Sequence, residues 1–347
     1  MAKPYRTGTR RVTLETVAKD ARVSVSTVSK VLNGRSGVSM ATRRAVEERL
    51  EKHGYSPRNT PNIAKTIEVV FFELDTEWIL EVLQGVDKVA RELGCSILLT
   101  RSHDLHSPER GWADGVVQRR PLGVILLFSS VSAADKRQLR NRSIPFVVVD
   151  PAGKPDPDIA YVGAQNWAGG LAATEHLISL GHREIAMING PEDQLCSQAR
   201  MSGFRAAMEM AGLSCRPEFL RWGDFHPEEG RSIAAELLQL PTRPTALFAG
   251  ADLQALGVYQ AAGELGLRIP EDLSVVGFDD LPIAALAWPP LTTVRQPIRD
   301  MAETAARVIT EPPDPQRQRL ELATELVIRA STSPCGASST QSAPTKT

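Results

Sequence analysis

Two adjacent carboxylates, Asp279 and Asp280, follow the apolar run LSVVGF and come nearest in this chain to a general acid–base pair. Adjacent side chains point in different directions, and neither a nucleophile nor a set of metal ligands stands at a recognisable spacing from these two. No GxGxxG follows the first strand-like run, and the sequence contains no GxxxxGKS, GxSxG or HExxH motif. The residues therefore favour binding over catalysis and indicate no metal and no cofactor.

The thiols and the hydropathy of the chain indicate its compartment. Cys95, Cys196, Cys215 and Cys335 lie far apart without a CxxC pair, so we expect neither a zinc site nor disulfides, but reduced and mostly buried thiols. No apolar run approaches the roughly 18 residues of a membrane span. The basic N-terminus lacks the apolar segment of a signal peptide. We therefore expect a cytoplasmic protein with no membrane partner.

The charge is divided unevenly along the chain. Residues 1–62 carry 13 Lys and Arg against 5 Asp and Glu, whereas the other 285 residues carry 27 against 36. A basic head on an acidic body is typical of a protein that meets a polyanion at one end, which predicts contact with DNA. A solvated basic terminus without a partner is the alternative.

The basic head predicts three short helices over residues 12–54, because apolar side chains recur there at helical spacing. These positions are Leu14, Val17, Ala18 and Ala21, then Val28, Val31 and Leu32, then Ala45, Val46 and Leu50. Thr13, Ser24 and Ser39 are the expected N-caps. The first two helices and their tight turn predict a helix-turn-helix unit, whose second helix enters the major groove of DNA.

The solvent face of the second helix supplies the candidate DNA contacts. The residues are Ser24, Val25, Ser26, Thr27, Ser29 and Lys30. Hydroxyls and amides at a helix start suit phosphate oxygens, whereas Val25 and Ser26 are the candidates for base edges, and Lys30 can donate to guanine or phosphate. A three-helix packing module with solvated Ser and Lys is the alternative.

From Ile67 to Arg329 short apolar runs alternate with amphipathic helical segments. The runs are 67–74, 95–100, 122–128, 146–150, 184–188, 245–250 and 273–278, and helical segments include 78–94, 166–181 and 252–266. This pattern predicts parallel sheets covered on both faces. The fold class expected is α/β: an all-α helix-turn-helix headpiece, then a two-lobed body with two doubly wound parallel sheets.

Two segments are poor in apolar residues. Residues 55–66 contain two prolines and two asparagines and predict a linker. Residues 331–347, STSPCGASSTQSAPTKT, are rich in Ser and Thr and have little to bury, so we expect a disordered tail.

The head resembles a known family. VTLETVAKDARVSVSTVSKVLNG, followed by GVSMATRRAVEERLEKHGYSP, is similar over residues 12–57 to the headpiece of the lactose/galactose repressor (LacI/GalR) family. The resemblance implies that Val25, Ser26 and Lys30 read bases. It implies phosphate contacts or headpiece packing for Ser24, Thr27, Ser29 and Asn33. Arg22 stands where the family commonly has Gly, so an unusual backbone or a phosphate contact is expected there.

The resemblance divides the chain into a headpiece (1–57), a short hinge linker (58–66), an effector-binding and dimerisation domain (67–330) and the tail (331–347). In the family a hinge helix forms on DNA and a Leu often wedges into the minor groove. Here the linker is shorter and has no Leu, which leaves Ile63 as the credible wedge and leaves open whether the helix forms.

The resemblance continues through the body in the GH of HLISLGHREIAMING, RxxGF at 200–204, IPEDLSVVGFDD and PPLTTVRQP. It implies a fold like periplasmic sugar-binding proteins, with two lobes joined by three crossovers. The implied effector-binding residues are Arg200 and Asp279 as polar anchors, Trp78, Trp167 and Phe225 as aromatics, and Asp150 and Arg101 as weaker candidates at strand ends. Core anchoring or a structural salt bridge is the alternative for each. Ala251 replaces an Asn or Ser that is common in the family.

The function expected is a homodimeric, sequence-specific repressor of a pseudo-palindromic operator, released by a sugar, either a mono- or an oligosaccharide derived from plant polymers. A regulator that requires its ligand as a corepressor, as purine-sensing members of the family do, is the second reading. An α/β enzyme with an added DNA-binding head is the third. The sequence leaves open the sugar, the operator and the regulated genes.

Overall fold

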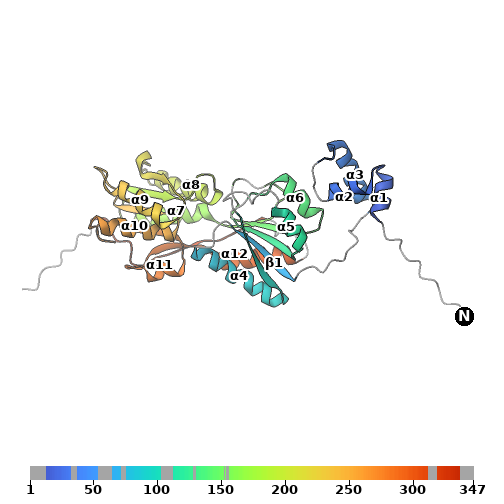
Figure 1. The fold of residues 1–347 in the computed structure, drawn as a ribbon. Coiled ribbons are helices and arrows are strands. Elements are labelled where there is room, and N and C mark those ends of the chain that lie inside the picture. Colours follow the sequence, from blue (N-terminus) through green and yellow to red (C-terminus); the bar gives the residue numbers. More distant parts are fainter. Residues whose placement is uncertain are drawn as a thin grey trace, which may run out of the picture.

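The computed structural model describes residues 13–32, 37–53, 65–71, 76–102, 112–127, 130–151, 153, 156–311 and 319–336. These residues form a headpiece of three helices and a body of two lobes, which we call the N lobe and the C lobe (Figure 1). The α/β fold class, with an all-α headpiece and two sheets in the body, is confirmed.

The headpiece consists of α1 (Leu14–Asp20), α2 (Val25–Leu32) and α3 (Met40–Lys52). Thr13 and Ser39 cap α1 and α3, since each Oγ accepts a hydrogen bond from the backbone N–H three residues on. One small apolar core joins the three helices, and its buried members are Val17, Ala18, Val28, Val31, Leu32 and Val46. The apolar spacing in the sequence predicted this core, because side chains three and four positions apart share one helix face.

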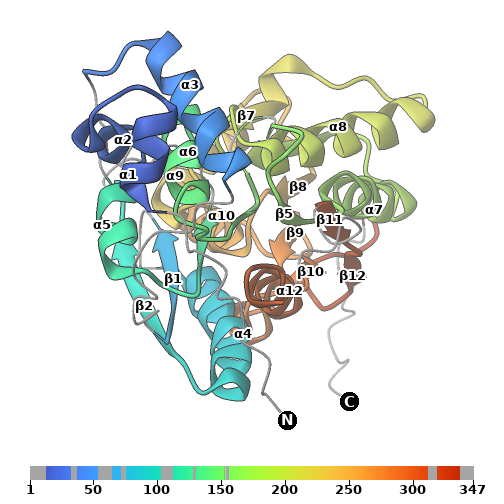
Figure 2. The same cartoon turned by 90° about the vertical axis from the view of Figure 1, so that its right-hand side faces the viewer.

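The N lobe is one parallel sheet with helices on both faces. Its strands are β1 (Thr66–Phe71), β2 (Ser96–Arg101), β3 (Gly123–Leu127), β4 (Phe146–Val149), β5 (Tyr161–Ala164) and β11 (Arg319–Leu322). They pair in the order β11-β5-β4-β3-β1-β2. Its helices are α4 (Glu77–Leu93), α5 (Trp112–Arg119), α6 (Ala133–Arg140) and α12 (Ile298–Thr310). Figure 2 shows α5 and α6 on the side of β1 opposite to α4 and α12.

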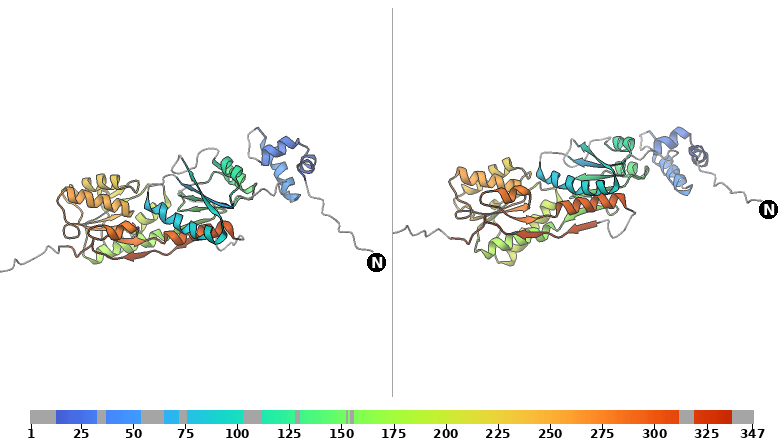
Figure 3. Two further views of the ribbon diagram at one scale, coloured as in Figure 1. Left: turned by 60° about the horizontal axis from the view of Figure 1, so that its bottom comes forward. Right: turned by 90° about the horizontal axis from the view of Figure 1, so that it is seen from below.

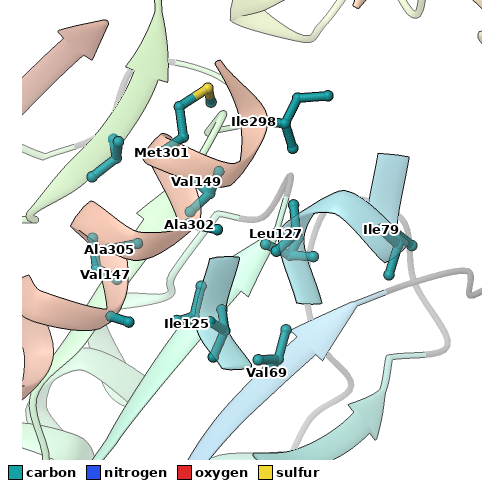
Figure 4. Close-up of a cluster of buried hydrophobic side chains, with 14 of the residues drawn as sticks. Val69, Ile79, Ile125, Leu127, Val147, Val149, Ile298, Met301, Ala302 and Ala305 are labelled. Atoms are coloured by element: carbon teal, nitrogen blue, oxygen red, sulfur yellow. The ribbon is translucent and has the colours of Figure 1, made fainter. Parts of the chain in front are cut away.

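The main core of the N lobe lies between the sheet and the α4 and α12 pair. Figure 4 shows Val69 and Ile125 of the sheet and Met301 and Ala302 of α12 in one cluster, and all four side chains are fully buried. The helices lie side by side in Figure 3, and the ion pairs Lys88–Glu303 and Arg307–Glu92 link their exposed edges. Continuous apolar strands are required here because both faces of the sheet are covered.

The C lobe repeats this architecture. Its strands are β6 (Ile185–Asn189), β7 (Leu220–Trp222), β8 (Ala246–Ala249), β9 (Ser274–Asp279), β10 (Thr292–Arg295) and β12 (Glu325–Val327). They pair in the order β12-β10-β9-β8-β6-β7, and β12 runs antiparallel to β10 while the other pairs are parallel. Its helices are α7 (Asn166–Ser179), α8 (Leu195–Met210), α9 (Pro227–Leu238), α10 (Asp252–Glu264) and α11 (Pro282–Leu286), with a 3-10 turn at Pro217–Phe219.

Three crossovers join the lobes, as the resemblance implied. The chain passes from β5 to α7 at Gln165, from β10 to α12 at 296–297, and from β11 to β12 at 323–324. The carboxyl ends of the central strands of both sheets therefore face one another across the cleft, which is where open parallel sheets bind ligands.

The prediction of a disordered tail from residue 331 was wrong for residues 331–336. Ser331 is fully buried, and its Oγ accepts a hydrogen bond from the N–H of Thr292 (2.8 Å) and donates one to the carbonyl of Val275 (2.6 Å). The Ser333 carbonyl lies 3.1 Å from Nε2 of His182, and the N–H of Cys335 donates to Leu180. Polar composition misled the prediction because these residues are held by hydrogen bonds rather than by apolar burial. Residues 337–347 lie outside the described residues.

Candidate DNA-binding and effector sites

Ser24 caps the start of α2. Its Oγ accepts a hydrogen bond from the backbone N–H of Thr27 (3.1 Å) and lies 2.8 Å from the hydroxyl oxygens of Ser26 and Thr27. The cap satisfies a backbone donor that the helix itself cannot pair. It also gathers three hydroxyls at the positive end of the helix dipole, where an anion such as a phosphate is stabilised.

The solvent face of α2 presents the predicted readout residues together. Val25 is 41% exposed, Ser26 and Lys30 are exposed, and Ser29 is half-buried. The opposite face of the helix is buried in the headpiece core, so the readout residues lie on the face that is turned away from this core. The other two predicted DNA contacts, Asn33 and Ile63, lie outside the described residues.

Arg22 adopts the left-handed backbone conformation that its departure from the family pattern implied. Its φ is 54°, in the turn between α1 and α2, and its side chain is exposed. A non-glycine residue pays a steric penalty in this region, which explains why Gly is common at this position in the family.

One contact between α1 and α3 could not be read from the sequence. The carboxylate of Asp20 lies 2.8 Å from Nε2 of His53 and 3.4 Å from Nε of Arg49. The hydrogen bond from His53 holds the pKa of Asp20 below its usual value, and the nearby cations add to this. The contact fixes the C-terminal end of α3 against the first helix of the reading unit.

A cavity of about 220 Å³ lies between the lobes, and we call it the anchor cavity. Its walls are Phe71, Thr76, Trp78, Ile79 and Leu127 of the N lobe and Pro191, Gln194, Cys196, Arg200, Asp224, Phe225, His226, Ala251, Leu253, Asp279 and Leu281 of the C lobe. Most of these residues follow the carboxyl ends of strands. The structure thus brings together four of the seven predicted effector residues, which are Trp78, Arg200, Phe225 and Asp279.

Arg200 is the buried polar centre of the anchor cavity. Its Nε donates to Oδ1 of Asn166 (2.8 Å) and its Nη2 to Oε1 of Gln296 (3.0 Å), and Nη1 donates to the carbonyl of Gly250. Asn166 and Gln296 stand at two of the three crossovers. The guanidinium is therefore fixed by residues at two of the three connections between the lobes as well as by the C lobe itself.

Asp279 completes the polar end of the cavity. Its Oδ1 lies 3.8 Å from Nη2 of Arg200, and only 7% of its surface is exposed. Burial raises the pKa of Asp279 to about 7; Arg200 opposes this shift and Asp150 adds to it. Burial likewise raises the pKa of Asp150 to about 6. Two buried carboxylates thus share one arginine, so the cleft readily holds a proton near neutral pH.

Three of the predicted effector residues have strained backbones. Asp150, Phe225 and Asp279 all have positive φ, at 46°, 71° and 114°. Such conformations cost free energy for residues with a Cβ and cluster at functional sites. Asp280, by contrast, lies outside the cavity lining and pairs with Arg295 and Arg329, so it does not form a carboxylate pair with Asp279.

A second cavity of about 470 Å³, the side cavity, lies beside the first. It is lined by Asp150, Pro151, Tyr161, Gly163, Ala164 and Glu321 of the N lobe, by Gln165 at the crossover, and by Asn166, Trp167, Ala168, Leu195, Cys196 and Ala199 of the C lobe. The predicted effector residues Asp150 and Trp167 lie here. Arg101 lines neither cavity: it is exposed on β2, opposite Phe71 in the register.

Sequence reasoning missed several cleft residues. Gln194 and Cys196 are buried in the cavity walls, and Asn166 and Gln296 hold Arg200. None stands in a recognisable chemical motif, although Asn166 and Gln296 flank the crossovers that the resemblance implied. Among the described residues no three His, Cys, Asp or Glu side chains are grouped to hold a metal. All four cysteines are free. Only Cys196 is buried, whereas Cys95 and Cys215 are half-buried and Cys335 is exposed, so the expectation of mostly buried thiols is wrong.

Comparison with known proteins identifies the two parts of the chain separately. The family profile "Bacterial regulatory proteins, lacI family" matches residues 13–58, and the profile "Periplasmic binding protein-like domain" matches residues 174–332. None of the described helices has the length and apolarity needed to span a bilayer.

Curated relatives match along most of their length. The HTH-type transcriptional repressor PurR of Escherichia coli O139:H28 is 33% identical over 306 residues, which cover 86% of this chain and 89% of the relative. PurR of Erwinia tasmaniensis is 34% identical over the same coverage.

Solved structures show the same architecture. A complex of the transcriptional regulator CelR with cellobiose is 33% identical, covers 92% of this chain and 100% of its own, and has a TM-score of 0.70. The lac repressor dimer bound to operator and the anti-inducer ONPF is 25% identical, covers 93% and 100%, and has a TM-score of 0.66. A regulator from Enterococcus faecium with bound ribose is 26% identical, covers 78% and 99%, and has a TM-score of 0.69.

These relatives are repressors and regulators rather than enzymes, which excludes the enzymatic reading of the body. The extent of the match to PurR, the profile over the headpiece and the two-lobed fold agree with one another. This chain belongs to the LacI family of bacterial regulatory proteins and is a DNA-binding transcriptional regulator that responds to a small-molecule effector.

Proposed function

We propose that this protein is a cytoplasmic homodimeric repressor that leaves its operator when a carbohydrate binds between its lobes. The main support for a carbohydrate effector is the anchor cavity, in which the buried pair Arg200 and Asp279 faces a space lined by the rings of Trp78 and Phe225. A guanidinium and a carboxylate each hold vicinal hydroxyls through two hydrogen bonds, and an aromatic face matches the C–H face of a pyranose. The relatives solved with cellobiose and with ribose support this reading.

The position of the cavity supplies a mechanism for release. Its walls come from both lobes, so a ligand that contacts both walls stabilises the arrangement in which the lobes are close together. Arg200 is bonded to residues at two crossovers, so a change at the guanidinium reaches the segments that connect the lobes. A coupling of about 1 to 3 kcal/mol between effector and operator is typical of such regulators.

On the DNA side, Val25, Ser26 and Lys30 are the proposed base contacts, and the hydroxyls of Ser24, Thr27 and Ser29 the proposed phosphate contacts. Their place at the start and on the solvent face of α2, where four of them are exposed and Thr27 and Ser29 are half-buried, supports this assignment. Asn33 and Ile63 keep their proposed roles from the resemblance. A homodimer would place two such helices in successive major grooves of a pseudo-palindromic operator.

The homodimer interface is proposed to lie along α4, β2 and α11. Leu80 of α4 and Leu99 of β2 are 51% and 41% exposed, and Leu286 of α11 and the adjoining Trp288 are 78% and 89% exposed. Figure 1 shows α4 and α11 along the same lower side of the body, one in each lobe. A dimer that used both would sense a change in the relative position of the lobes.

A two-stage binding experiment tests this function. Duplexes selected from a random pool give the operator, and fluorescence anisotropy measures its affinity at increasing salt. Log K should fall linearly with log salt, because several phosphate contacts release counterions. A screen of neutral mono- and disaccharides at constant salt should then find one that weakens operator binding.

The outcomes separate the readings. A flat salt response, or no preference for the selected duplex over random DNA, would remove the DNA-binding assignment. A carbohydrate that tightens operator binding would instead identify a corepressor-dependent regulator. If nucleobases or amino acids release the operator and no carbohydrate does, the carbohydrate proposal is wrong while the regulator assignment stands.

A further inference from the structure

We propose that the effector has two sugar rings, the first in the anchor cavity and the second, uncharged, in the side cavity against Trp167. This inference rests on the carbohydrate function proposed above and specifies the class of carbohydrate. Small-molecule sites usually measure about 300 to 1,000 Å³. The anchor cavity alone, at about 220 Å³, falls below that range, whereas the side cavity adds about 470 Å³.

The two cavities adjoin at Cys196, which is the one described residue common to both linings. Its small side chain is 4% exposed and its Sγ lies 3.6 Å from Oε1 of Gln194. The hydrogen bond from Arg200 to Asn166 also joins a lining residue of the anchor cavity to one of the side cavity. Cys196 therefore marks the place at which a ligand held by Arg200 and Asp279 would enter the second space.

Trp167 gives the side cavity a stacking surface. It stands in the first turn of α7 and is 46% exposed, whereas Trp78 in the anchor cavity is 7% exposed. The close packing of α7 on α8 fixes its place, because a Cβ at Gly203 would overlap the carbonyl oxygen of Trp167. A sugar ring that covers the half-exposed indole of Trp167 removes apolar surface from water. A single-ring ligand in the anchor cavity leaves this surface uncovered.

The polar groups of the side cavity suit hydroxyls and disfavour anions. The carboxylates of Asp150 and Glu321 and the hydroxyl of Tyr161 line it, and the Tyr161 hydroxyl donates to Oε1 of Glu321 (3.3 Å). Among the described residues of this lining there is no Lys, Arg or His, unlike the anchor cavity, which contains Arg200 and His226. A neutral second ring can donate its hydroxyls to the carboxylates, whereas a uronate or a sugar phosphate meets like charge.

Isothermal titration of the full-length protein with matched sugars tests the proposal. The pairs are D-glucose with cellobiose and D-xylose with xylobiose, together with an aldobiouronic acid whose acidic ring is terminal. For the pair that binds, we expect the disaccharide to bind about tenfold more tightly than its monosaccharide, which corresponds to about 1.4 kcal/mol. The aldobiouronic acid should bind more weakly than the neutral disaccharide.

Variants assign that gain to the side cavity. Trp167→Ala should remove the preference for two rings and leave monosaccharide affinity unchanged, and Trp167→Phe should restore part of it. Ala199→Trp, which fills the side cavity from α8, should also remove the preference for two rings. Trp78→Ala should weaken the binding of both sugars of a pair. Met210→Ala, at an exposed position of α8, should change neither affinity.

Equal affinity for the two sugars of a pair that binds would overturn the two-ring proposal and leave the carbohydrate function standing. Equal losses for both sugars in Trp167→Ala would overturn it as well. If the protein still binds the operator but binds neither monosaccharides nor disaccharides, the two-ring proposal and the carbohydrate proposal fail together.

Discussion

The ring of Phe225 lies against the backbone of Gly190, and a Cβ at Gly190 would overlap its Cζ, Cε1 and Cε2 atoms. Gly190 directly follows β6, and Phe225 holds a left-handed backbone with φ at 71° after β7. The ring reaches the anchor cavity, 5.5 Å from the guanidinium carbon of Arg200, because its neighbour has no side chain. Gly190 is thus a positioning residue for the aromatic wall.

Gly190→Ala should therefore weaken effector binding by displacing the ring of Phe225. We expect a loss of about tenfold, equivalent to about 1.4 kcal/mol, measured by isothermal titration. Operator affinity without effector should stay unchanged. The pair Gly190→Ala and Phe225→Ala forms a double-mutant cycle: once the ring is gone, the methyl group should cost nothing further. Additive losses would show that Gly190 acts by another route.

Asp279→Asn should stabilise the ligand-free protein at alkaline pH. Because burial raises the pKa of Asp279 from 3.8 to about 7, the folded protein keeps a proton that the unfolded chain loses between these values. The unfolding free energy contributed by this group therefore falls as the pH rises from about 4 to 7. An amide mimics the protonated carboxyl, and each pKa unit corresponds to about 1.4 kcal/mol.

Thermal denaturation at pH 5 and pH 8 checks this. We expect the variant to gain on the order of 2 kcal/mol over the parent protein at pH 8 and less at pH 5. The same variant should lose effector affinity, since an amide offers one acceptor oxygen to the hydroxyls of the effector where a carboxylate offers two. A destabilised variant at pH 8 would mean that the ionised carboxylate with Arg200 stabilises the fold.

Lys30→Ala should weaken operator binding without changing effector affinity. If Lys30 contacts a phosphate, the slope of log K against log salt falls by about 1 and all duplexes are affected alike. If it contacts guanine, discrimination at one position falls by about 1 to 3 kcal/mol. Anisotropy with the operator and with single-base variants distinguishes the two. Lys136→Ala, in an ion pair of the N lobe, is a matched control that should leave operator binding unchanged.

Removal of residues 331–347 should destabilise the C lobe, whereas removal of residues 337–347 should not. The longer deletion leaves the buried N–H groups of Thr292 and Val275 without their partners in Ser331, and each unpaired buried group costs about 1 to 3 kcal/mol. The shorter deletion retains both hydrogen bonds. Chemical denaturation of the two truncated proteins measures the difference. Equal stability would mean that water replaces Ser331 without cost.

Leu286→Asp should shift the protein from dimer to monomer. Leu286 is 78% exposed on α11, and a carboxylate in an apolar interface must be desolvated without a partner. Sedimentation velocity at several concentrations measures the dissociation constant of the dimer. When the dimer is lost, operator affinity should fall as well, because the two half-sites are then bound by separate monomers. Met210→Asp, at an equally exposed position of α8, serves as the control. An unchanged dimer would place the interface elsewhere.

Local patterns in the sequence predicted much of the architecture. The headpiece core follows from apolar spacing, and the caps at Thr13, Ser24 and Ser39 follow from side chains that pair backbone N–H groups within three residues. The buried strands of both sheets appear as continuous apolar runs because helices cover both faces. Short strands such as β7 and β12 went unpredicted, since three residues carry too little pattern.

By itself the sequence determined the helix-turn-helix unit, the alternation of strands and helices, and the family to which both belong. Only the tertiary structure decided that Arg200 is held by Asn166 and Gln296, residues far apart in the chain that meet at two crossovers. It also decided that Trp167 and Trp78 occupy separate cavities and that Ser331 is buried under β9 and β10. Neighbour patterns reveal local conformation, whereas a binding cleft depends on contacts between distant segments that form only when the lobes fold.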